Sequence, residues 1–134
     1  MYRQLLMLGV LALGSVLAHP VSGARLSVPG GRYAQLDAAT LHGQLASKDF
    51  TLINVHVPYE GEIAGTDRFV PFDRVAQDRR LPKDRAAEIV VYCRSGRMSE
   101  VAARALVKLG YTNVRELRGG MNAWAAAGYA LRER

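Results

Sequence analysis

The stretch that decides the fold is IVVYCRSGRMS, residues 89–99. Residues 89–92 are apolar and mostly β-branched, which is typical of a short strand buried on both faces. This strand leads directly into Cys93, and Gly96 permits a tightly curved turn after it. Ser99 is expected to be the N-cap of the helix that follows. The sequence therefore predicts a strand, a turn and a helix N-terminus arranged around one thiol.

Short apolar strands and amphipathic helices alternate on both sides of this stretch. Asp37 is the expected N-cap of the first helix. We expect helices at about 38–46, 73–80, 99–109 and after Gly120, a short one opened by 81–84, and strands at 50–55, 69–72, 89–92 and 114–117. Alternation of this kind predicts an α/β domain with a mainly parallel sheet flanked by helices on both faces. Ligands collect beyond the carboxyl ends of such strands, where Cys93 lies.

The helix after the Cys93 turn is expected to bury one apolar face. That face combines small and branched side chains: Val101, Ala102, Ala105, Leu106 and Leu109. Gly110 then ends the helix.

The first 24 residues differ in kind from the rest. A short positive segment that contains Arg3 precedes an almost wholly apolar run at 5–18, which is shorter than the roughly 20 residues that span a bilayer. Small residues at Ser22 and Ala24 suit cleavage after Ala24, with Ala18 as the alternative. Residues 1–24 are thus predicted to be a signal peptide that directs a periplasmic or secreted protein, and an uncleaved signal anchor remains the competing interpretation.

The remaining chain is basic and fits a single domain. The full chain has 134 residues and a formal charge of +6, which becomes +5 once Arg3 is removed with the leader. Residues 27–31 are expected to be a leader loop, and the domain is expected to occupy 33–132. The charges are scattered without aromatic interleaving, so a nucleic-acid partner is not expected, whereas a preference for small anions is.

The chain contains one cysteine, so it cannot form an internal disulfide. A lone thiol in an exported protein is either buried and inert or kept for its reactivity. Backbone amides, the positive end of a helix dipole, Arg94 and Arg97 would all favour the thiolate here. We therefore expect a reactive Cys93, although each arginine taken alone could be a solvated surface charge.

Two segments carry a resemblance to a known family. CRSGRMS at 93–99 resembles the active-site loop of the rhodanese family, and LGYTNV at 109–114 with LRGGMNAW at 117–124 and Gly128 resembles its C-terminal half. The similarity extends over about 33–131. It implies a rhodanese-like fold in which Cys93 is catalytic and Arg94, Ser95, Gly96, Arg97, Met98 and Ser99 form the substrate-binding loop.

The resemblance also implies a reaction. Cys93 would accept a sulfane sulfur from a small sulfur-containing anion such as thiosulfate and hold it as a persulfide. It would then pass the sulfur to a thiol or cyanide acceptor, or to a sulfur-relay protein. No cofactor and no separate general base are implied.

The chain departs from the family pattern at three places. Asn54-Val55-His56 stands where the family usually has an Asp-Val-Arg-like triplet, and EIAG at 62–65 replaces a His-Ile-Pro-Gly-like turn. Met98 occupies a position where many members carry Arg, and we expect Arg97 to supply that charge. These departures leave the class intact and put the rate and the donor preference in question.

Competing chemistries are less consistent with the loop. Related phosphatases place an arginine six positions after the cysteine, and that position is Ser99 here. No metal site is expected, because His42 and His56 lack ligand spacing; His56 is a loop hydrogen-bonder or reaches the active-site rim. Two alternatives to an enzyme stay open, namely a persulfide carrier or sensor with a partner protein and a structural domain with an inert thiol.

Overall fold

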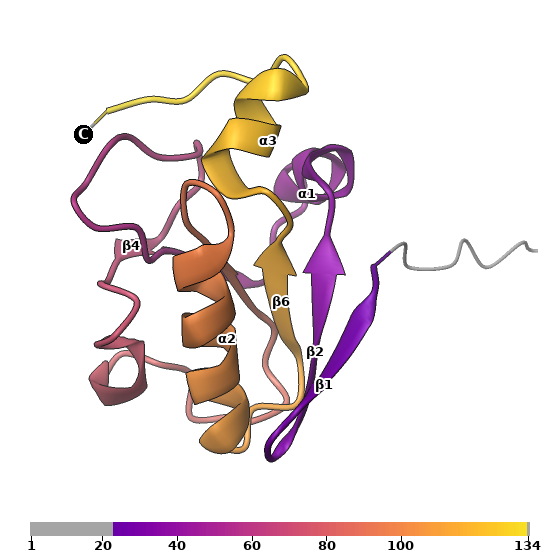
Figure 1. Cartoon of the computed structure of the whole chain (residues 1–134), viewed down its shortest axis with the longest axis vertical. Coiled ribbons are helices and arrows are strands. Elements are labelled where there is room, and N and C mark those ends of the chain that lie inside the picture. Colours follow the sequence, from indigo (N-terminus) through magenta and orange to yellow (C-terminus); the bar gives the residue numbers. More distant parts are fainter. Residues whose placement is uncertain (1–22, 134) are drawn as a thin grey trace, which may run out of the picture.

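The computed structural model describes residues 23–133 as one six-stranded sheet with helices on both faces (Figure 1). The strand order is β1-β2-β6-β5-β3-β4, and every pair is parallel except the antiparallel β1–β2. The strands are β1 (Arg25–Val28), β2 (Gly31–Leu36), β3 (Thr51–Asn54), β4 (Arg68–Phe69), β5 (Ile89–Tyr92) and β6 (Val114–Leu117). The helices are α1 (Ala38–Leu45), α2 (Arg97–Lys108) and α3 (Gly120–Ala126), with one 3-10 turn, η1 (Val75–Gln77). The expected fold class is confirmed.

The alternation of side chains along β5 divides the core into two layers. Val91 and Cys93 pack toward α2, together with Ile53, Val114 and Leu106. Val90 and Tyr92 point to the other face, where the buried residues of α1 and α3, including Leu41, Met121 and Trp124, cover them. Because β5 lies inside the sheet, all four of its residues are fully buried, and its carboxyl end is a rigid platform for the residue that follows.

The expected leader loop at 27–31 is instead part of a hairpin. β1 and β2 pair from Arg25↔Ala34 to Val28↔Gly31, so the sheet begins before the expected start at Tyr33. The ladder even reaches back to Ala24, whose carbonyl accepts a hydrogen bond from the Gln35 amide at 2.9 Å. The Pro29–Gly30 pair that suggested a loop forms the turn between two strands. Of the expected leader, residues 1–22 lie outside the described residues.

The helix expected at 73–80 shrinks to η1, and 81–84 form no helix. Val75 is the one residue of η1 that is buried, so there is little apolar contact to stabilise a helix this short. The Asp78 carboxylate also accepts the Arg80 amide at 3.0 Å, a local bond that competes with helix continuation. Among residues 23–133, no helix is long and apolar enough to cross a membrane.

Candidate functional site

Cys93 follows β5 directly and lies under the first turn of α2. Its side chain is 1% exposed and belongs to the apolar layer on the α2 face of the sheet. Among the described residues, two hydrogen-bonding groups approach the sulfur: the Gly96 amide donates to Sγ at 3.0 Å, and the Ser99 hydroxyl lies 3.4 Å away. Of the backbone amides in the predicted substrate-binding loop, that of Gly96 thus donates to the thiol sulfur. A backbone donor in this position stabilises negative charge on sulfur.

α2 begins two residues earlier than the sequence indicated, so Ser99 is not its N-cap. Gly96 takes that position with a φ of +112°, a left-handed conformation that favours glycine. The buried face also differs from the expected one, because α2 buries Ala103 and Val107 while Val101 and Leu109 are 48% and 38% exposed. Ser99 lies inside the first turn and points into the protein.

The Ser99 side chain connects the thiol to a buried carboxyl group that the sequence analysis missed. Ser99 Oγ lies 2.7 Å from Glu116 Oε1 and 3.0 Å from the Gly96 carbonyl oxygen. The other carboxyl oxygen of Glu116 accepts a hydrogen bond from Gln35 Nε2 at 3.0 Å. Glu116 is fully buried on β6, and burial raises the pKa of its carboxyl above the ordinary 4.5, against the hydrogen bonds from Ser99 and Gln35 that lower it.

The N-terminus of α3 fixes the backbone of the Cys93 loop from the opposite side. Met121 and Asn122 donate their amides to the carbonyls of Cys93 and Arg94, both at 2.9 Å. The two backbones approach so closely at Gly120 that a Cβ there would lie 2.3 Å from the Cys93 carbonyl oxygen. Gly120 therefore allows the N-terminus of α3 to hold the loop that leads from Cys93 into α2.

The outer rim of the loop carries an ion pair in place of a free arginine. Arg94 Nη1 is hydrogen-bonded to Glu60 Oε2, and His56 Nε2 lies 3.2 Å from the same carboxylate oxygen. The Arg94 guanidinium lowers the pKa of Glu60, with a smaller contribution from His56. The sequence expected Arg94 to be available to substrate and His56 to be either a loop or a rim residue; His56 reaches the rim through Glu60.

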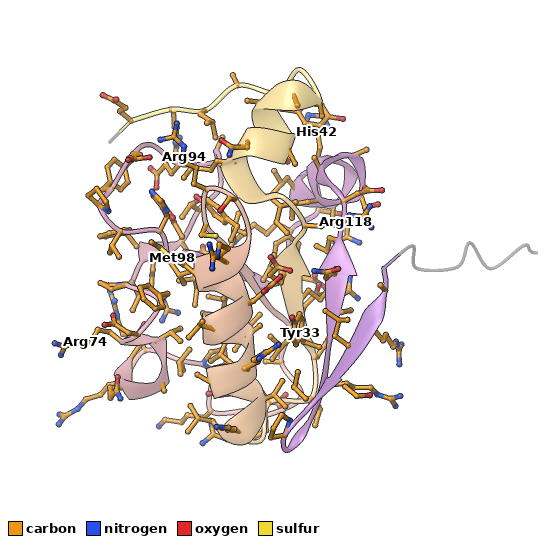
Figure 2. All side chains as sticks on the ribbon, in the orientation of Figure 1. Tyr33, His42, Arg74, Arg94, Met98 and Arg118 are labelled. Atoms are coloured by element: carbon orange, nitrogen blue, oxygen red, sulfur yellow. The ribbon has the colours of Figure 1, made fainter. Side chains whose placement is uncertain are left out.

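Two of the other predicted loop residues, Ser95 and Arg97, lie on the exposed side of the loop, which we call the mouth of the site. Ser95 and Arg97 are exposed, and Arg97 forms no ion pair with any residue in the described range 23–133. Met98 is half-buried and packs against the apolar layer that contains Cys93. Figure 2 shows Met98 and Arg94 at the N-terminal end of α2. The one cation of the loop that is free for an anion is therefore Arg97.

The family departures in the N-terminal half support the loop that carries Glu60. Asn54 Oδ1 accepts the His56 amide and Asn54 Nδ2 donates to the Gly61 carbonyl, each at 3.0 Å. An ionised aspartate at position 54 could accept the first bond but could not donate the second. Tyr92 holds the far side of the same loop, because its hydroxyl accepts the Ile63 amide at 3.0 Å and burial raises the pKa of Tyr92 to about 12.

Within residues 23–133, no cluster of three or more His, Cys, Asp or Glu side chains could hold a metal ion. His42 stacks on Tyr129 with ring centroids 4.0 Å apart, which accounts for its place on α1.

The comparison with family models decides the relationship, because residues 38–127 match the model described as Rhodanese-like domain. The chain belongs to the rhodanese-like domain family. A sulfurtransferase from Allochromatium vinosum is 35% identical over 101 residues, covering 72% of this chain and 92% of the relative. The probable adenylyltransferase/sulfurtransferase MoeZ of Mycobacterium tuberculosis is 33% identical over 85 residues, which cover 60% of this chain and 21% of that protein.

Solved rhodanese-like structures share the architecture. The rhodanese-like domain of an Anabaena protein superposes with a TM-score of 0.66 at 26% identity, covering 75% of this chain and 79% of that chain. A rhodanese-related protein from Thermoplasma volcanium gives a TM-score of 0.60 at 26% identity, covering 72% and 95%. This rhodanese-like domain is thus related by sequence and by fold to proteins of sulfur transfer.

Proposed function

We propose that the protein is a sulfurtransferase that moves a sulfane sulfur from a donor such as thiosulfate to a thiophilic acceptor through a persulfide on Cys93. The single observation that carries the proposal is the Gly96 amide 3.0 Å from Cys93 Sγ, in a loop between the carboxyl end of β5 and the N-terminus of α2. A preorganised donor aimed at Sγ stabilises the thiolate that attacks the donor and the thiolate that returns when the acceptor removes the outer sulfur.

The first half-reaction forms one bond and breaks one. The Cys93 thiolate attacks the outer sulfur of thiosulfate, a new S–S bond forms, and the bond to the sulfonate sulfur breaks with its electron pair leaving on sulfite. The protein retains Cys93–S–S⁻. In the second half-reaction a thiolate or cyanide attacks the outer sulfur, and the electron pair of the broken S–S bond returns to Cys93. No net oxidation of the protein occurs over the cycle.

The burial of Cys93 restricts the donor. With the side chain 1% exposed, a slender group such as a terminal sulfur or the methylene carbon of iodoacetamide is expected to reach Sγ, whereas a bulky electrophile is not. Arg97 at the mouth supplies a positive charge that attracts an anion. The pairing of Arg94 with Glu60 removes a second charge that thiosulfate could use.

That ion pair favours a second candidate, a sulfur carrier that receives its persulfide from a partner protein and shows little turnover on small anions. MoeZ and similar proteins combine adenylyltransferase and sulfurtransferase in their names, and a relay role would suit a domain of this size. A persulfide donor presents a single negative sulfur and needs less positive charge at the rim than thiosulfate does.

One experiment distinguishes the two. Thiocyanate production from thiosulfate and cyanide is compared with sulfur transfer from a persulfidated protein, with iodoacetamide-alkylated protein as the blank for both. The enzyme proposal expects steady turnover on thiosulfate that the blank lacks. Transfer from the protein persulfide alone supports the carrier, and activity equal to the blank with both donors would contradict both.

Export remains part of the proposal, supported by the composition of residues 1–24. Cleavage after Ala24 would remove the carbonyl that accepts the Gln35 amide, whereas cleavage after Ala18 would keep it. N-terminal sequencing of protein expressed with its leader in a bacterial host tests both points. A product that starts at Met1 and stays in the membrane would instead indicate an uncleaved anchor.

A further inference from the structure

The Ser99 hydroxyl has one proton and three neighbours that can accept it. These are Glu116 Oε1 at 2.7 Å, the Gly96 carbonyl oxygen at 3.0 Å and Cys93 Sγ at 3.4 Å. If the thiol and the carboxyl were both ionised, two negative groups and a carbonyl would share that single proton in a buried space. Such an arrangement is unfavourable, so a second proton is retained by either Cys93 or Glu116.

The directions of the hydrogen bonds follow from where that second proton lies. With a carboxylate at Glu116, Ser99 donates to Oε1 and its oxygen accepts from the Cys93 S–H. With a protonated Glu116, the carboxyl donates to Ser99 and the hydroxyl proton turns toward a Cys93 thiolate. The two states differ by the transfer of one proton from Sγ to Ser99 Oγ and of the hydroxyl proton from Oγ to Glu116 Oε1, and the total charge is unchanged.

We infer that Glu116 is a positioning residue that receives the Cys93 proton through the Ser99 hydroxyl and so generates the thiolate without release of a proton to solvent. The inference goes beyond the proposed function, which it supports by supplying the base that the sequence analysis judged unnecessary. The attacking thiolate forms as Glu116 gains its proton. The proton stays on Glu116 while the persulfide carries the negative charge on its outer sulfur.

The surroundings of Glu116 favour this role. The groups that face it are Gln35 and Tyr33 on β2, Ser99 and Glu100 on α2, and Arg118 after β6. The charges of Glu100 and Arg118 oppose each other there. Burial brings the affinity of the carboxyl for a proton closer to that required of a base near neutral pH.

The test uses alkylation of Cys93 by iodoacetamide, which reports thiolate because the chain has no other cysteine. Between the two coupled ionisations the wild-type thiolate fraction is set by the internal proton transfer, so the alkylation rate passes through a plateau with pH. In Glu116→Gln the acceptor is lost, and the rate should rise about tenfold per pH unit in a single step. Glu100→Gln removes a neighbouring charge that is not among the hydrogen-bond partners of the Ser99 hydroxyl, and it should move the profile but keep the plateau.

A single-step profile in folded wild type that superposes on that of Glu116→Gln would overturn the inference. An infrared titration of the wild-type protein covers the case in which the variant does not fold. The carboxylic-acid band of Glu116 should titrate at a different pH after Cys93 is alkylated, because coupling between two groups is reciprocal. An unchanged midpoint would also overturn it. Neither measurement depends on sulfur transfer, so failure here and failure of the proposed function are distinguishable.

Discussion

Two glutamates lie on either side of the Cys93 loop, and their surroundings shift the pKa values of their carboxyl groups in opposite directions. Glu116, on the inner side, is fully buried, and burial raises the pKa of its carboxyl. Glu60, on the outer rim, is exposed, and the Arg94 guanidinium lowers the pKa of its carboxyl. Glu116 on the inner side is thus suited to hold a proton, whereas Glu60 on the outer side is suited to hold a negative charge. We therefore expect thiolate formation and donor selection to be separable properties of one loop.

The largest effect is expected from substitution of Cys93, which lies between the two sides. Cys93→Ser should abolish persulfide formation and sulfur transfer, because an oxygen cannot hold a sulfane sulfur reversibly. The similar size should leave the melting temperature within a few degrees of wild type. Turnover measures the expected loss of sulfur transfer, and thermal unfolding measures the melting temperature. Transfer above a few per cent in the folded variant would contradict the role of Cys93.

The next largest effect concerns the contact that fixes the whole loop. Gly120→Ala should lower the free energy of unfolding by about 2–4 kcal/mol, because the new Cβ would lie 2.3 Å from the Cys93 carbonyl oxygen. Gly128→Ala is the matched control, since Gly128 also has a positive φ of +90° but a Cβ there would meet no heavy atom within 4 Å apart from its chain neighbours. This substitution should cost about 1–2 kcal/mol. Urea unfolding measures both. Equal losses would mean that backbone strain, and not overlap with the loop, dominates at Gly120.

The raised pKa of Glu116 on the inner side predicts that the stability of the protein depends on pH. The folded protein keeps a proton on Glu116 at a pH where the unfolded chain has lost it, so stability falls as pH rises from the ordinary 4.5 to the raised pKa. Glu116→Gln should remove up to about 1.4 kcal/mol of this loss per pH unit. The difference between the two urea-unfolding curves isolates Glu116 from Glu88, whose pKa burial also raises. If the difference in the free energy of unfolding did not change with pH, ionisation of Glu116 would not contribute to stability.

On the outer side, Arg97→Ala should lower kcat/KM for thiosulfate by roughly threefold to tenfold, since an exposed charge contributes ~1 kcal/mol. Added salt should weaken the wild-type reaction by the same mechanism. Lys108→Ala is the matched control, because it removes the same charge from the last residue of the same helix. If both variants behave alike, Arg97 acts through net charge and not through its position at the mouth.

The smallest effect is expected at the ion pair. Glu60→Gln should raise kcat/KM for thiosulfate by about twofold to fivefold, because Arg94 is then free to bind the anion. The increase should vanish in a protein that also carries Arg94→Ala, which a double-mutant cycle measures. A gain that persists without Arg94 would assign the effect to the charge of Glu60 alone.

The elements around Cys93 were predictable because local sequence dictates them. The β-branched run at 89–92 and the glycines at 96 and 119–120 indicate a strand and two turns from propensity alone. The predicted start of α2 was wrong because CRSGRMS contains two residues that can cap a helix, Gly96 and Ser99. The Ser99 hydroxyl is instead bonded to Glu116 on β6, which is a tertiary contact. Each local signal was correct, but their competition is settled by packing.

The places of Glu116 and Glu60 in the site could not be predicted from local sequence. Glu116 lies in the short strand VREL, where a charged residue ordinarily faces solvent, and its partners Ser99 and Gln35 are 17 and 81 residues away. Glu60 meets Arg94 across 34 residues. The signal available in the sequence was the position of Glu116 next to Leu117 in a strand of a mainly parallel sheet, whose strands are ordinarily buried on both faces.

The mass of the intact protein after exposure to thiosulfate tests the central claim most directly. We expect a mass increase of one sulfur atom, located on the peptide that contains Cys93 and lost on addition of cyanide. Folded wild-type protein that keeps its unmodified mass with thiosulfate and with a persulfide donor would contradict the account.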